Sequence, residues 1–484
     1  MIAGYCWPQS VRAGETVTVF CHSNAPRLHA LVERQGPEAV EVAARELAGQ
    51  IQELPDDLCV RGCDWRPSFE VTVDSTWPTG MYLVRFSTSE GERAEAFFVV
   101  RSPAPRDALL VLATASWSAY NHWGGPSLYT GQNISATRRP LPAGFLERPD
   151  PKRVRAAAGI DLTPEQIEEW SQMDLSGWTG AAGWAGWEQL FANWAERQGL
   201  ELDYAISQDL DRNPDLLGGY PAYISVGHDE YWSAGMRDAV EGYIDAGGNA
   251  AFFSGNTSWW QVRFESDYGQ VVGYKHEFEK DPVYGTDQQR SLSTMWSDPL
   301  VGRPENHMTG VSFTRGGYAH MAHSPRGSGG YTVWRPEHWA FDGVELRAGD
   351  LLGAEPVVVG FECDGCELEL RDGLPYATGR DGTPEDFTVL ATAPAHLWEQ
   401  HELTPGVGDA YVGDLNWVAQ RLGGEDTPEM RASFAMGAAV MGSFRRGRGE
   451  VFTTGCTDWA YGLDDPAVDR VTRNVLSRFI GKEL

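Results

Sequence analysis

The strongest constraint on the fold of this chain is a change of sequence pattern near residue 107, where short, continuous apolar runs begin. The first run covers residues 108–113, and similar runs follow at 202–206, 222–226 and 249–254. A parallel strand that is covered on both faces needs an unbroken apolar run, whereas a half-exposed strand alternates apolar and polar residues. These runs therefore predict the strands of a buried, mostly parallel sheet.

Helical periodicity separates the later runs. Apolar residues between 187 and 194 fall at positions i, i+3, i+4 and i+7, and those over 236–244 fall at i, i+4, i+7 and i+8, which is also a helical period, with Ser233 as a predicted N-cap. Alternating strands and helices predict an α/β fold with a doubly wound, mostly parallel sheet of the flavodoxin-like or glutamine-amidotransferase-like kind. Further strands are expected at 357–359, 387–390 and 450–452.

Residues 1–102 follow a different pattern, with short β-prone runs separated by turn residues. This pattern predicts a small, all-β, immunoglobulin-like sandwich. The domain organisation expected from the sequence is therefore a sandwich over 1–102 and an α/β catalytic domain over 103–484. A stretch near 265–350 is poor in regular pattern, and we expect it to form a long loop insertion over the sheet.

Charge and cysteine content exclude several classes of function. The chain has 39 Lys plus Arg against 68 Asp plus Glu, a formal charge of -29, which argues against a nucleic-acid partner and against an anionic membrane surface. No apolar stretch approaches the ~20 residues of a membrane-spanning helix. The N-terminal residues do not resemble a signal peptide, and seven cysteines do not suggest a disulfide framework. A cytoplasmic location with reduced thiols is expected.

Polar motifs follow three of the predicted strands. They cover residues 117–125, 227–232 and 255–260. Open parallel sheets bind ligands at the carboxyl ends of their strands. We therefore expect the active site at this edge of the sheet.

His228 and Glu230 are two residues apart at the end of a predicted strand, so both side chains can point to one face. The carboxylate could bind a metal ion while the imidazole orients a substrate or moves a proton. In the structural alternative, Asp229 caps the helix that starts near Ser233, and His228 and Glu230 only pair with each other.

Four other residues are candidates for the same site. Tyr120 and Tyr129 flank a Gly-Gly turn and could be packing residues, but a phenolate is also a hard ligand suited to ferric iron. Asn256 either tolerates a left-handed turn or donates an amide hydrogen bond to a carbonyl substrate. Glu362 follows a predicted strand, where most carboxylates are solvated.

Other chemistries have weaker signals. Cys59 and Cys63 could bind zinc together with Cys363 and Cys366, although the two pairs come from different predicted domains. The chain has no G-x-S-x-G elbow and no phosphate-binding glycine motif that opens a helix after a strand. Nineteen tryptophans could line a carbohydrate-binding cleft or form packing contacts.

The same motifs carry a resemblance to a known family. Over about residues 107–480 the chain resembles the catalytic part of the large (beta) subunit of N,N-dimethylformamidase, a family of amide hydrolases with a mononuclear iron. The resemblance depends mainly on WSAYNHWGGPSLY at 117–129, GHDEYWS at 227–233 and FFSGNTSWWQVR at 252–263. Weaker similarities are PEHW at 336–339, GFECDG at 360–365 and TDWAYGL at 457–463.

This resemblance implies a site in which two tyrosines and one glutamate hold ferric iron. Glu230 matches the glutamate ligand, Tyr120 is the candidate for one tyrosine and Tyr129 for the second. His228 and Asn256 match a histidine and an asparagine of the family site, and Glu362 matches a further carboxylate. The resemblance implies that these three residues are catalytic. Zinc is the alternative metal. The family enzyme also has a small companion subunit, so a companion subunit or a homo-oligomer is expected.

We therefore predict a metal-dependent hydrolase that cleaves the C–N bond of a small, N-substituted amide such as a formamide. The ion would polarise the carbonyl group and activate a water molecule. The alternative hypothesis is a non-catalytic protein that binds a carbohydrate or a partner protein through a tryptophan-rich cleft.

Overall fold

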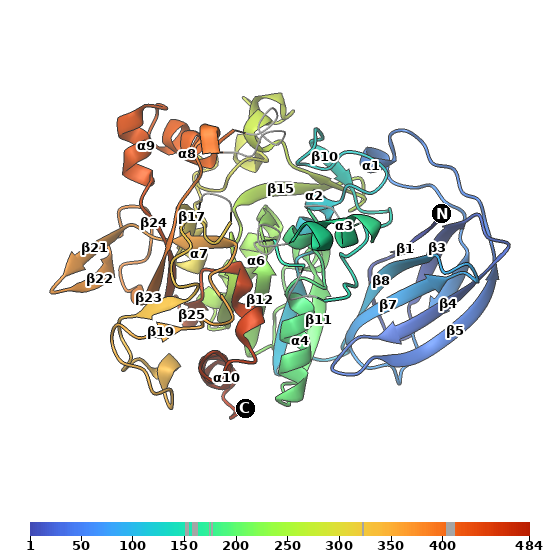
Figure 1. Cartoon of the computed structure of the whole chain (residues 1–484), viewed down its shortest axis with the longest axis horizontal. Coiled ribbons are helices and arrows are strands. Elements are labelled where there is room, and N and C mark those ends of the chain that lie inside the picture. The colour runs from blue at the N-terminus through green and yellow to red at the C-terminus, as the bar shows by residue number, and fades with distance from the viewer. Residues whose placement is uncertain (151–153, 157–162, 174, 176–177, 322–323, 403–411) are drawn as a thin grey trace.

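The computed structural model describes residues 1–150, 154–156, 163–173, 175, 178–321, 324–402 and 412–484. Within these residues the strands form six sheets. In Figure 1 the N-terminal sheets lie on the right, and the largest sheet runs through the centre and left of the molecule.

Residues 1–102 contain two sheets whose inner faces share one apolar core. Val17, Val19, Val84 and Phe98 are among the core residues, and they come from both sheets. The immunoglobulin-like assignment and the boundary near residue 102 stay predictions. The three-stranded sheet has the order β1 (Ile2–Trp7), β3 (Thr16–Ser23), β6 (Phe69–Thr72), and the five-stranded sheet has the order β2 (Ser10–Arg12), β8 (Arg93–Arg101), β7 (Gly80–Ser87), β4 (Arg27–Arg34), β5 (Val40–Ala48).

The largest sheet has nine strands and two halves of different character. Neighbouring strands are parallel from β11 to β25 and antiparallel from β25 to β19. The strands of the parallel half are buried along most of their length, as the continuous apolar runs require. The order is β11 (Leu202–Ile206), β9 (Ala108–Leu112), β12 (Ala222–His228), β14 (Asn249–Gly255), β25 (Gly449–Thr453), β24 (Gly437–Arg446), β23 (Thr388–Ala395), β18 (Tyr331–Val333), β19 (Leu351–Leu352).

The prediction of a doubly wound, mostly parallel sheet of the flavodoxin-like or glutamine-amidotransferase-like kind is wrong. The chain is rich in sheets, all six described sheets are mixed or antiparallel, and helices are few. β24 and β25 are separated by residues 447–448 alone, which is too short for the crossover that a parallel pair needs. Apolar runs report burial on both faces of a strand and not its direction. The run at 357–359 forms no strand, because it lies in turns where Val357 has φ +57°.

The longest helices lie in the second part of the chain. They are α4 (Glu188–Arg197), α6 (Ala234–Asp245) and α10 (Pro466–Ile480). The Ser233 side chain accepts a hydrogen bond from the backbone of Met236, so the predicted N-cap is confirmed. No helix in the described ranges is long and apolar enough to cross a membrane.

Shorter elements surround the sheets. The stretch 265–350, expected to form long loops, contains short strands, one-turn helices and turns. The remaining α-helices and strands are α1 (Leu58–Arg61), α2 (Thr114–Tyr120), α3 (Pro164–Gln172), α5 (Ser207–Arg212), α7 (Asn306–Thr309), α8 (Asp414–Leu422), α9 (Pro428–Phe434), β10 (Ile134–Ala136), β13 (Tyr231–Ser233), β15 (Trp260–Glu265), β16 (Gln270–Val272), β17 (Ser312–Tyr318), β20 (Glu362–Gly365), β21 (Leu368–Arg371) and β22 (Leu374–Ala377).

A buried charge network anchors α6, the helix that follows the polar motif at 227–233. Glu241 accepts hydrogen bonds from Arg237 on the same helix at 2.9 Å, from Arg303 at 2.8 Å and from Arg446 at 3.0 Å. Burial alone would raise the pKa of Glu241, but Arg237 and the other two guanidinium groups lower it to about 2. The network joins α6 to the end of β24 and to the loop at Arg303.

Glu241→Gln is expected to lower the free energy of unfolding by ~3 kcal/mol at neutral pH, because it leaves buried guanidinium groups without their counter-charge. The pKa of Glu241 is lower in the folded state, so its contribution is present above its ordinary pKa of 4.5 and is lost as pH falls toward 2. Urea denaturation between pH 7 and pH 3 measures both effects. The control is Asp238→Asn, at an exposed neighbour, which should change the free energy of unfolding by no more than ~0.5 kcal/mol. Equal effects of Glu241→Gln and Asp238→Asn would contradict this account.

Candidate functional site

The end of the parallel half of the sheet brings together all six residues that the sequence singled out. Tyr120 ends α2, which follows β9, and Tyr129 lies in the loop beyond it. His228 ends β12, and Glu230 lies between β12 and β13. Asn256 directly follows β14, and Glu362 begins β20. His228 and Gly255 are register partners, so the ends of β12 and β14 lie side by side.

Three side-chain oxygen groups meet at Glu230. The hydroxyl of Tyr129 donates to one carboxylate oxygen at 2.6 Å, and the hydroxyl of Tyr120 lies 2.9 Å from the other. The two hydroxyl oxygens are 2.8 Å apart, and the two rings stack with centroids 4.3 Å apart. Burial raises the pKa of Glu230 and raises that of Tyr120 well above its usual range, so the phenol of Tyr120 is neutral in this arrangement.

An imidazole lies between this oxygen cluster and a second carboxylate. His228 Nε2 is 2.5 Å from Glu362 and 3.3 Å from Glu230, while Nδ1 donates to the carbonyl of Ala181 at 2.8 Å. Burial lowers the pKa of His228, but the carboxylates of Glu362 and Glu230 outweigh it and raise the pKa to about 10. His228 therefore carries a positive charge and a proton that faces Glu362.

Asn256 lies in the left-handed region, with φ +50°, a conformation that asparagine tolerates. Its side-chain amide donates to Glu362 at 2.9 Å, whereas its buried Oδ1 makes no hydrogen bond. The sequence suggested that this amide donates to a carbonyl substrate; in the structure it contacts Glu362. Oδ1 is left to accept a hydrogen bond from a group that enters the site.

Asp229 does not cap α6. Its carboxylate accepts a hydrogen bond from the hydroxyl of Ser225 at 2.8 Å, and Ser233 provides the cap. The alternative in which His228 and Glu230 only pair with each other is incomplete, because Tyr120, Tyr129 and Glu362 contact the same two residues.

Sequence patterns missed two residues of this site, Tyr231 and Lys275. The hydroxyl of Tyr231 donates to that of Tyr129 at 2.8 Å, and Lys275 Nζ lies 3.4 Å from the Tyr129 ring centroid. Tyr231 directly follows Glu230 in the sequence, and this position beside a candidate ligand could have indicated it. Lys275 lies in a stretch without regular pattern, where nothing in the sequence indicated its position.

The donor set fits a hard, highly charged cation. Tyr120, Tyr129 and Glu230 offer only oxygen atoms, which hydrogen-bond to one another at 2.6 to 2.9 Å. A cation held there would favour deprotonated phenols, although burial opposes the ionisation of Tyr120. No group of three or more His, Cys, Asp or Glu side chains among the described residues is arranged to hold a metal, so an ion at this site would depend on the tyrosines.

The cysteine pairs do not form one cluster. Cys59 and Cys63 lie in or next to α1, whereas Cys363 lies opposite Cys456 on a β-bridge. All seven cysteines are buried, free thiols.

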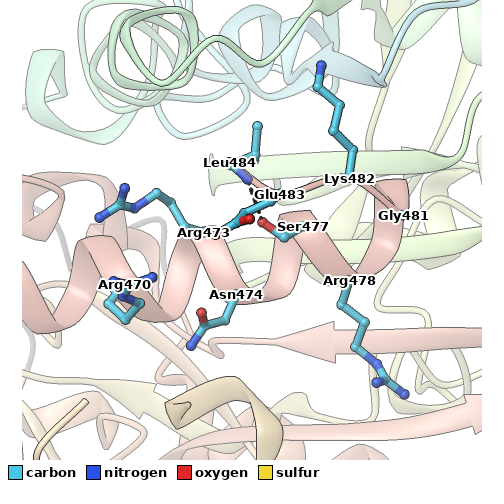
Figure 2. A pocket seen from close by; sticks show the side chains of 9 residues that line it. All are labelled: Arg470, Arg473, Asn474, Ser477, Arg478, Gly481, Lys482, Glu483 and Leu484. Atoms are coloured by element: carbon cyan, nitrogen blue, oxygen red, sulfur yellow. Dashed lines mark hydrogen bonds between the residues drawn. The ribbon is translucent and has the colours of Figure 1, made fainter. Parts of the chain in front are cut away.

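Most of the candidate site is buried, and only Tyr129 among its six residues is partly exposed. Five of its six residues are at most 5% exposed, namely Tyr120, His228, Glu230, Asn256 and Glu362. A surface pocket of about 380 Å³ lies elsewhere, on α10 and the residues after it. Figure 2 shows side chains that line it, among them Arg470 and Arg473. Eight of the largest fully buried side chains are tryptophans, which therefore pack the interior and line no open cleft: Trp117, Trp184, Trp187, Trp232, Trp259, Trp260, Trp296 and Trp459.

Comparison with known proteins identifies the family. Residues 32–473 match the family model described as N,N-dimethylformamidase beta subunit-like, C-terminal. The chain belongs to this family. This match confirms the resemblance seen in the motifs. The matched region begins within β4, whereas the resemblance was limited to about residues 107–480.

Two relatives are named N,N-dimethylformamidase beta subunit. The protein from Alcaligenes sp is 24% identical over 461 residues, and that from Paracoccus aminophilus is 23% identical over 461 residues. Each alignment covers 88% of this chain and 55% of the relative. The chain thus spans about half the length of the curated relatives that it matches.

Close backbone packing positions Glu362 against the end of β14. A Cβ atom on Gly255 would lie 2.5 Å from the Thr457 nitrogen and 2.6 Å from the Glu362 carbonyl oxygen. Gly255→Ala is therefore expected to lower the free energy of unfolding by about 1–3 kcal/mol through overpacking. Gly242→Ala in α6, where a Cβ meets nothing within 4 Å, should be neutral or stabilising by up to ~1 kcal/mol. Urea denaturation checks both; an unchanged Gly255→Ala protein would contradict this packing.

Proposed function

We propose that the chain hydrolyses the C–N bond of a small, N-substituted amide such as a formamide, with a mononuclear ferric ion at Tyr120, Tyr129 and Glu230. The observation that supports this most is the meeting of three oxygen groups, two of them from buried residues, beside a charged imidazole–carboxylate pair. Membership of the N,N-dimethylformamidase beta subunit-like family supports the same chemistry.

Iron fits this donor set better than zinc. Zinc sites in proteins use mainly thiolate and imidazole ligands, whereas the three groups here are two phenols and a carboxylate. When bound, the ion supplies Lewis acidity, which polarises the amide carbonyl and makes water a better nucleophile at neutral pH.

The other residues of the site are placed to transfer protons and to orient the reacting groups. His228 is charged and faces Glu362 at 2.5 Å, so it is placed to donate a proton to the leaving amine nitrogen. Glu362 is placed to accept a proton from the attacking water. The unpartnered Oδ1 of Asn256 can accept a hydrogen bond from that water or from the amine.

Aromatic rings set the size of the substrate. Trp178 packs 5.1 Å from the Tyr129 ring, and Phe361 packs 5.5 Å from the His228 ring. Such walls exclude bulk water and favour a small amide with little polar surface.

Tyr129→Phe is expected to remove most of the bound iron, because it deletes one of three oxygen ligands. Purified wild-type protein should contain about one iron per chain and show the visible absorption of ferric tyrosinate, and the variant should lose both. Elemental analysis and absorption spectroscopy measure this and also detect zinc. Tyr376→Phe, at an exposed tyrosine of β22, is the matched control. A Tyr129→Phe protein that keeps iron and colour would refute the ligand assignment.

Glu362→Gln is expected to slow amide hydrolysis by about 10²–10⁴-fold, since it removes the proton acceptor but preserves shape. The assay is release of dimethylamine from N,N-dimethylformamide by iron-loaded protein. Glu369→Gln, at a carboxylate of β21 that pairs with Arg371 at the surface, should leave the rate unchanged. Equal rates for the two variants, or a wild-type protein that releases no amine, would count against the proposed reaction.

We also propose that the chain functions in an assembly, because the matched relatives are named as subunits. Native mass spectrometry is expected to detect a complex heavier than one 53.3 kDa chain, through a companion subunit or self-association. A chain that stays monomeric at micromolar concentration, also when it is coexpressed with a companion subunit, would contradict this.

A further inference from the structure

A buried lysine lies directly against the phenols of the candidate site. Lys275 begins the short 3-10 helix η3 (Lys275–Lys280) and is only 6% exposed. Its Nζ lies 3.4 Å from the centroid of the Tyr129 ring and donates to the hydroxyl of Tyr231 at 3.4 Å. A cation over the face of an aromatic ring is attracted by the electron-rich face, and more strongly where water is excluded.

The Tyr129 ring has close neighbours on both faces. The Tyr120 ring stacks on it with an interplanar angle of 23° and a centroid distance of 4.3 Å. The Lys275 ammonium is too close to share that face, so the Tyr129 ring lies between Tyr120 and Lys275. The hydroxyl of Tyr231, which accepts from Lys275, donates in turn to that of Tyr129 at 2.8 Å.

The backbone at Lys275 is held in a strained conformation. Its φ is +51°, in the left-handed region that residues with a Cβ rarely adopt. The backbone nitrogen of Lys275 donates to the carbonyl of Ser293 at 2.6 Å, and the Ser293 hydroxyl donates to Asp281 at 2.7 Å. Strain of this kind persists where surrounding contacts specify it, and it concentrates at functional sites.

The charge of Lys275 is directed at the tyrosines. Among the described residues, no carboxylate lies within ion-pair distance of its Nζ, although Glu230 and Asp414 are near enough to favour the charged form. A lysine with a purely structural role would be expected to pair with a carboxylate or extend to solvent.

We propose that Lys275 is a positioning residue for Tyr129. Its ammonium group holds the Tyr129 ring against Tyr120 and, through the hydroxyl of Tyr231, directs the Tyr129 hydroxyl at Glu230. The part of this inference that concerns ion binding rests on the proposed function above. Without the ammonium group, the ring loses one of its two faces of contact, and the third oxygen is no longer fixed beside the other two.

Fe³⁺ titration of metal-free protein tests the consequence for the ion. Lys275→Met is expected to weaken Fe³⁺ binding by about tenfold or more, equivalent to ~1.4 kcal/mol, and to shift the ferric tyrosinate absorption band. Lys280→Met, at an exposed lysine of the same η3 helix, should change neither. Lys275→Arg keeps a cation over the ring and should restore the wild-type band. Unchanged affinity and band in Lys275→Met would overturn the proposal.

Fluorine NMR of metal-free protein labelled with 3-fluorotyrosine tests the positioning itself, without iron. The Tyr129 resonance, identified by its absence in Tyr129→Phe, should shift in Lys275→Met and not in Lys280→Met. A resonance that does not move would overturn the proposal even if the protein binds iron. Wild-type protein that binds no Fe³⁺ would contradict the proposed function, and this spectrum would then decide the role of Lys275. If Lys275→Met does not fold, Lys275→Gln is the second variant.

Discussion

The buried carboxylate of Glu230 is the constraint on which the arrangement of the site depends. Glu230 is 2% exposed, and a carboxylate removed from water without partners costs several kcal/mol. Its partners are the hydroxyls of Tyr120 and Tyr129, from a segment about a hundred residues earlier in the chain. Satisfying this one group therefore requires the loop after α2 to pack over the end of β12. Polar contacts as well as apolar packing determine how this edge of the sheet is built.

The same contacts explain why the residues of the site leave no open space between them. His228, Glu362 and Asn256 use one another as partners, and the two phenols use Glu230. An incoming ion or substrate must replace contacts that the protein makes with itself. The strained backbone of Lys275 lies beside this cluster, which is where proteins retain such strain when it helps to hold reactive groups in place.

The sequence predicted the positions of four strands of the large sheet and the convergence of the polar residues that follow them, because continuous apolar runs are a local pattern, but the doubly wound parallel fold assigned to these strands was wrong. Residues 108–112 and 222–228 form strands as expected, and His228, Glu230 and Asn256 meet as their positions after strands implied. The antiparallel half was not predicted, since strand direction depends on the length of the connections and not on apolar content. Lys275 could not be predicted, because a strained turn in an irregular segment places it beside Tyr129.

The central claim is that Tyr120, Tyr129 and Glu230 bind one metal ion. Crystals of iron-loaded protein, measured at wavelengths on both sides of the iron absorption edge, test it most directly. The account predicts a single anomalous peak within bonding distance of an oxygen of each of these three residues. The absence of a peak there, or a peak at the cysteine thiols instead, would contradict the account.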